Sequence, residues 1–114
     1  MSIPAWIQSF PGAITVCDVN GTIVEMNDQA AQVFASSGGH SLIGTDLFAC
    51  HSEASRQKLR GMMDGQTPNV YTIEKNGQKK LIYQAPWYGE DGQFAGFIEL
   101  SVVIPTEMPH FIRG

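Results

Sequence analysis

The chain has 114 residues, a net charge of −4 and two cysteines, which is the size of one domain whose core needs no disulfide or metal. It has no cluster of Lys and Arg to neutralise phosphates and no apolar run of the roughly 20 residues that cross a bilayer, so nucleic acid and membrane are not expected partners. No basic segment marks a secretory signal and both cysteines are expected to be buried, reduced thiols, so we expect a cytoplasmic protein.

The first predicted element is a short helical segment within residues 1–12. Pro4 suits the first turn of a helix, where the missing N–H costs nothing. Trp6, Ile7 and Phe10 would form its apolar side. A helix this short is not stable alone in water, so it must pack against the rest of the molecule.

A β-hairpin is predicted next. Residues 13–18 and 23–26 are rich in β-branched and apolar side chains, as strands are. Between them, Asn20-Gly21 is a typical signal for a tight turn, because a type I′ turn needs positive φ at both central residues. The hairpin therefore opens a sheet.

The second strand runs directly into a predicted helix at residues 27–35. Asn27 is a favoured N-cap, and Asp28 places a negative charge in the first turn, where the helix dipole favours it. Three apolar residues at helical spacing give this helix one side that can cover a sheet: Ala30, Val33 and Phe34.

The middle of the chain is predicted to be helical but broken. Residues 42–48 indicate one or two short helical turns, and a longer helix is predicted over Glu53–Asp64. Ser52 is its expected N-cap and Gly65 its expected C′ residue. The apolar side of this helix consists of Leu59, Met62 and Met63.

The last part of the domain changes to strand periodicity. Three strands are predicted over residues 70–75, 80–87 and 94–104, joined by turns that contain Gly77 and Gly92. We therefore predict an α+β fold, with a five-stranded antiparallel sheet and short helices packed on one face. The expected domain spans residues 13–104, and residues 105–114 form a tail.

Alternation along the last three strands divides their side chains between two faces. The inner face, under the helices, is expected to carry Thr72, Ile82, Gln84 and Ile98. The outer face is expected to carry Tyr71, Ile73, Tyr83 and Phe97. That is more aromatic surface than a monomer leaves in water, so we expect the N-terminal segment with Trp6, or a second subunit, to cover it.

The order of these motifs resembles a PAS domain over residues 13–104. Asp18 and Gly21 bracket the first hairpin and Asn27 caps the next helix, as in the family's opening. Leu42-Ile43-Gly44 resembles the step after that helix, and His51-Ser52-Glu53 resembles the start of the family's long helix, with Ser52 in place of proline. The resemblance implies a sensory or interaction module.

In PAS domains, ligands lie between the inner sheet face and the helices. By position, the resemblance implies a ligand pocket formed by Phe34, Phe48, Met63, Thr72, Ile82, Gln84 and Ile98, with Leu59 beside them. Gln84 is the most informative of these residues, because a buried amide must find hydrogen-bond partners. It can bind a neighbouring backbone group or water, or it can contact a ligand.

His51 is the expected axial ligand only if the protein holds haem, as some PAS relatives do. We find no second pair of metal ligands at the spacing that a zinc site needs. We also find no nucleophile with a base and an orienting group, so we expect neither a metal centre nor an enzyme.

We therefore expect a cytoplasmic PAS sensory module that binds a small organic ligand and signals through a homodimer, formed by the outer sheet face and the N-terminal segment. The first alternative is a structural dimerisation or partner-docking domain with no ligand. The second is a haem-binding gas or redox sensor.

Overall fold

A single antiparallel sheet organises the molecule. The computed structural model describes residues 3–50 and 52–114, and all its strand pairs are antiparallel, as predicted. The first hairpin pairs with the last strand, so the two ends of the domain meet in the middle of the sheet. The strands lie in the order β2 (Ile23–Met26), β1 (Ala13–Asp18), β5 (Phe94–Ile104), β4 (Gln78–Tyr88) and β3 (Asn69–Lys75).

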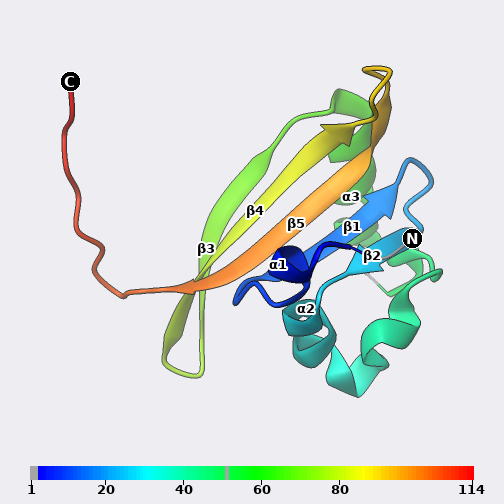
Figure 1. Cartoon of the computed structure of the whole chain (residues 1–114). Helices are drawn as coiled ribbons and strands as arrows, with labels where there is room; N and C mark the ends of the chain where they lie inside the picture. Colours follow the sequence, from blue (N-terminus) through cyan, green and yellow to red (C-terminus); the bar gives the residue numbers. More distant parts are fainter. Residues whose placement is uncertain (1–2, 51) are drawn as a thin grey trace.

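Short helical elements lie before the first hairpin and between it and the last three strands. Together with the sheet they confirm the predicted α+β class. Figure 1 shows α3 behind the sheet and α1 in front of it. None of the helices that the structure describes is long and apolar enough to cross a membrane. The elements are α1 (Ala5–Gln8), α2 (Asp28–Val33), the 3-10 turns η1 (Ala35–Ser37), η2 (Gly39–Leu42) and η3 (Leu47–Cys50), and α3 (Glu53–Gly65).

Helix caps form where the sequence predicts them. The side-chain oxygen of Asn27 accepts a hydrogen bond from the Ala30 amide at the start of α2, and Ser52 accepts one from the Ser55 amide at the start of α3. At the end of α3, the left-handed conformation falls on Gln66 (φ 51°), one residue beyond the predicted Gly65.

Two of the hairpin turns differ in type. Asn76 and Gly77 both have positive φ, at 53° and 77°, as a type I′ turn requires. At the first turn only Gly21 has positive φ, because Asp18 takes over part of the turn: its carboxylate accepts hydrogen bonds from the amides of Asn20 and Thr22. The hairpin is present, but the predicted I′ geometry there is wrong.

Strand register assigns the two faces, because residues directly opposite each other point to the same side. Gln84 lies opposite Glu99, and Glu99 lies opposite Thr15. Phe97 lies opposite Cys17 on the same side. From Phe97 onward, the odd-numbered residues of β5 therefore point to the inner face.

This register corrects part of the predicted face assignment. Ile98 lies opposite Val16 and Ala85, so it belongs to the outer face, and Phe97 belongs to the inner one. On β3, Thr72 is opposite Leu81 on the outer face, whereas Tyr71 and Ile73 are inner. Alternation divides the residues of each strand into two sets, but it does not say which set of one strand shares a sheet face with which set of the next. Ile82 and Gln84 are inner and Tyr83 is outer, as predicted.

The core lies on the inner face and consists of two clusters of buried residues. One joins the first hairpin to α2 through Ala13, Ile23, Met26 and Ala30. The other joins the sheet to α3. Leu47 of η3 packs against both, so the helical segments cover the same face of the sheet. The residues of the second cluster are Cys17, Met62, Met63 and Phe97.

Phe10 of the N-terminal segment lies against the outer face. A Cβ atom on Gly12 would lie 2.7 Å from the Phe10 ring and 3.1 Å from Leu100, which places Phe10 beside an outer-face residue. Trp6 is 73% exposed, so the expectation that it covers this face is wrong. At the other end, residues 105–114 form no helix or strand and extend away from the sheet (Figure 1).

Candidate functional site

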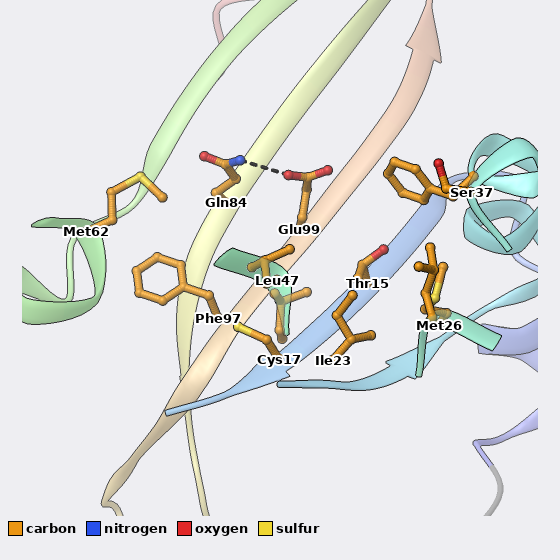
Figure 2. Close-up of a pocket in the computed structure, with 13 residues that line it drawn as sticks. Thr15, Cys17, Ile23, Met26, Ser37, Leu47, Met62, Gln84, Phe97 and Glu99 are labelled. Atoms are coloured by element: carbon orange, nitrogen blue, oxygen red, sulfur yellow. Dashed lines mark hydrogen bonds between the residues drawn. The ribbon is translucent and has the colours of Figure 1, made fainter. Parts of the chain in front are cut away.

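A cavity of about 300 Å³ lies between the inner sheet face and the helical segments. Strands β1, β4 and β5 form its floor, and residues from β2, the C-cap of α2, the 3-10 turns and α3 surround it (Figure 2). Most of its lining is apolar, as in small-molecule sites. The lining residues are Thr15, Cys17, Ile23, Met26, Phe34, Ser37, Leu42, Leu47, Met62, Gln84, Phe97, Ile98 and Glu99.

Polar side chains cross the floor of this cavity in a single row. Thr15, Glu99, Gln84 and Asn69 lie opposite one another on four adjacent strands, β1, β5, β4 and β3. We call them the polar row. All four are half-buried. The neighbouring rows contain the buried Phe97 on one side and the buried Ile82, opposite Ser101, on the other.

The hydrogen bonds along the polar row are all donated toward Glu99. The Asn69 amide nitrogen donates to the Gln84 oxygen at 3.0 Å, and the Gln84 amide nitrogen donates to Oε2 of Glu99 at 2.8 Å. Figure 2 shows the second of these bonds at the floor of the cavity. The chain of donors ends at a carboxylate, which has further lone pairs to offer.

Burial controls the ionisation of two inner-face groups. It raises the pKa of the Cys17 thiol, so this free cysteine is protonated at neutral pH. It also raises the pKa of the Tyr71 phenol, and the Glu99 carboxylate adds to that effect. The inner face therefore presents a neutral thiol and a neutral phenol. Among the described residues, no group of three His, Cys, Asp or Glu side chains could hold a metal ion.

The structure brings only part of the predicted set to the cavity. Phe34 and Gln84 line it. Ile98 borders it, but its register places the side chain on the other face, so only its main chain faces the cavity. Thr72 points to the opposite face and does not line it. His51 lies outside the described residues.

Three other predicted residues serve the core instead. Met63 and Ile82 are buried, with exposed fractions of 8% and 6%, but do not line the cavity. Phe48 packs its ring over the first hairpin, where a Cβ on Gly21 would lie 2.3 Å from it, and the Arg60 guanidinium lies 5.2 Å from the centre of that ring.

The most informative lining residue, Glu99, is not in the predicted set. Alternation along β5 places it on the same side as Phe97, and assigning that side to the outer face removes both from the site. A charged residue in the middle of an apolar strand is the signal that could have identified it, because such a residue in a sheet that is covered by helices needs a polar partner.

Comparison with known proteins identifies the fold. No family model matches the sequence, and no curated protein matches it. Solved structures do match. A PAS domain from Colwellia psychrerythraea is 20% identical with a TM-score of 0.63, and the alignment covers 87% of this chain and 91% of that one.

The chain has a PAS fold. Two further matches extend the comparison. Aer2 of Vibrio cholerae, described as a dual PAS-heme oxygen sensor, is 17% identical with a TM-score of 0.63 over 82% of this chain and 95% of that one. A structure of VqmA bound to DPO is 16% identical with a TM-score of 0.67, over 88% of this chain and 56% of that one.

The PAS fold explains where the cavity lies. The five-stranded antiparallel sheet with short helices agrees with the resemblance, which is confirmed at the level of the fold. The cavity occupies the space between the inner sheet face and the helices, where the resemblance places ligands.

Proposed function

We propose that this PAS-fold chain is a sensory module that holds a small organic ligand in the cavity above the polar row. The observation that carries the proposal is the cavity itself: about 300 Å³ of space, mostly apolar, with a few convergent polar groups on one wall. This combination is typical of ligand sites, and the volume lies at the small end of their range of roughly 300–1,000 Å³.

The surroundings of the cavity fit a site that reports occupancy. Its wall includes Phe34 at the end of α2, Leu47 of η3 and Met62 of α3. A ligand would therefore touch three separate helical elements, of which Leu47 packs against both core clusters. Binding that favours one arrangement of these elements shifts the population of that arrangement. VqmA, whose fold is similar, has been solved with DPO bound.

Filling the cavity tests the proposal. In Thr15→Phe, an aromatic ring replaces a small side chain on the cavity floor, and we expect the variant to lose small molecules that co-purify with the wild-type protein. Thr72→Phe is the matched control, because Thr72 carries the same change on the exposed outer face.

Native mass spectrometry measures this difference in protein purified from cells and in the same protein after incubation with a cell extract. We expect a bound small molecule in the wild type and in Thr72→Phe, and an empty Thr15→Phe that still folds by circular dichroism. A wild-type protein that carries no small molecule under any of these conditions, or equal occupancy in both variants, would contradict ligand binding in this cavity.

A second candidate function is dimerisation or partner docking without a ligand. The observation in its favour is apolar side chains on the outer face and the N-terminal segment: Val70 is 49% exposed, Tyr83 44% and Trp6 73%. Val70 and Tyr83 lie opposite each other on β3 and β4 and form one patch. We propose homodimerisation through this patch under either function.

The haem hypothesis stays a prediction. None of the residues that line the cavity is a histidine, and His51 lies outside the described residues. A strong absorption band near roughly 400 nm in protein from cells supplied with haem would support it, and a colourless protein would reject it. A cytoplasmic location and the absence of enzymatic activity also remain expectations; the reduced, buried Cys17 is consistent with the first.

A further inference from the structure

The polar row narrows the chemistry of the ligand. We infer that the cavity selects a small, mostly apolar molecule that presents a cationic or N–H donor to the Glu99 carboxylate. This inference rests on the proposed function and deepens it. It depends on which groups in the cavity still have hydrogen-bonding capacity after the protein's own bonds have been made.

Glu99 is the one charged side chain among the lining residues. Its Oε2 accepts from Gln84 at 2.8 Å. Among residues 3–50 and 52–114, no nitrogen of Lys, Arg or His forms an ion pair with it: the pairs found are His40–Asp28 and Arg56–Glu53. Within the described part of the chain, the carboxylate therefore lies at the cavity without an ion-pair partner.

The direction of the polar row decides which ligand groups fit. Asn69 donates to Gln84, and Gln84 donates to Glu99. One oxygen of the carboxylate therefore already accepts a hydrogen bond from the protein. What remains on Glu99 is acceptor capacity, because an ionised carboxylate has two oxygens and no proton to give. A ligand donor meets this capacity, whereas a ligand carboxylate or phosphate would place a second negative charge beside it.

The cations over this face, Lys58 of α3 and Lys80 of β4, form no ion pair with Glu99. Lys58 of α3 places its ammonium 5.8 Å from the centre of the Tyr71 ring, over the same sheet face. The rest of the lining is apolar apart from Thr15, Ser37 and Gln84, whose side chains are neutral. A half-buried carboxylate in such surroundings attracts a donor and disfavours an anion.

A series of probes of one shape tests this inference. Benzamidine, benzamide and benzoate share one ring and differ in the group attached to it: a cation, a neutral donor and an anion. Each would be titrated into the ¹⁵N-labelled full chain, with binding followed by the amide signals of the lining residues. We expect benzamidine to bind at least about tenfold more tightly than benzoate, as a charge-assisted hydrogen bond implies, with benzamide between them.

Variants assign the preference to Glu99. Glu99→Gln keeps the shape and an oxygen that can accept from Gln84, but removes the charge. It should weaken benzamidine binding about tenfold and leave benzoate unchanged or tighter. Glu74→Gln removes the same charge from an exposed position on β3 and should change neither affinity. Thermal unfolding of both variants shows whether the fold is retained.

The outcomes separate this inference from the proposed function. If all probes shift the lining signals with equal affinity, or Glu99→Gln keeps the wild-type order, the donor preference is wrong while ligand binding stands. If no probe shifts any lining signal, the inference is also overturned, and the co-purification test with Thr15→Phe decides the proposed function independently.

Discussion

At the scale of single residues, Asn27 connects more of the structure than any neighbour of the cavity. Its oxygen accepts from the Ile14 amide at 2.9 Å and from the Ala30 amide at 3.1 Å, and its nitrogen donates to the carbonyls of Ile7 and Gly12. The residue is 1% exposed. One amide thus holds the N-terminal segment, β1 and α2 together.

Removing this amide should be costly. Asn27→Ala leaves several main-chain groups without partners, and each buried group that loses its hydrogen bond costs roughly 1–3 kcal/mol. We expect urea unfolding to show a loss of about 2–4 kcal/mol in the free energy of unfolding. Asn20→Ala, at an exposed turn, should cost much less. Equal losses in the free energy of unfolding would show that the hydrogen bonds of Asn27 stabilise the fold no more than an exposed turn residue does.

At the scale of elements, Gly96 of β5 lies directly against the backbone of β1. This residue has φ of 144°, and a Cβ atom there would lie 1.9 Å from the Cys17 carbonyl oxygen. The same oxygen accepts a hydrogen bond from the Trp87 indole at 3.0 Å. The close approach therefore lets β4 make a side-chain contact across β5 to β1.

A methyl group at this position should separate the strands. We expect Gly96→Ala to destabilise the protein by more than about 3 kcal/mol or to prevent folding, because both the backbone conformation and the space exclude a side chain. Gly92→Ala, at a turn with positive φ but open space, isolates the conformational cost of about 1 kcal/mol. Similar melting temperatures for the two variants would contradict a steric role for Gly96.

The elements also show what sequence can and cannot predict here. Turns and caps depend on a few neighbouring residues, so Asn76-Gly77, Asn27 and Ser52 could be assigned from local chemistry. The faces of β3 and β5 depend on register with strands far along the chain. Glu99 stands out in the sequence as a charge within an apolar strand, but its place beside Thr15 and Gln84 follows only from the strand register.

At the scale of the whole molecule, the two sheet faces differ in what covers them. The helical segments cover the inner face around the cavity but leave Tyr71 and Ile73 exposed at its β3 edge, whereas Val70 and Tyr83 are exposed on the outer face. Exposed apolar groups that lie together are typical of protein interfaces. The proposed homodimer would remove this patch from water.

A charge at the centre of the patch should prevent association. We expect Tyr83→Glu to raise the dimer dissociation constant at least about tenfold in sedimentation velocity, because the carboxylate would lose its hydration at the interface. Ile73→Glu is the control: it adds the same charge to an exposed position on the inner side of the same sheet edge. A wild-type protein that stays monomeric at high concentration would refute the proposal.

The polar row has a consequence for how such a pocket can change. Its members come from four strands, one position each, and the helical wall contributes none of them. Substitutions along this row should therefore change which ligand the proposed site prefers without altering the Val70–Tyr83 patch or the helices that cover the cavity. Ligand preference and association of two chains would then depend on different residues of the same fold.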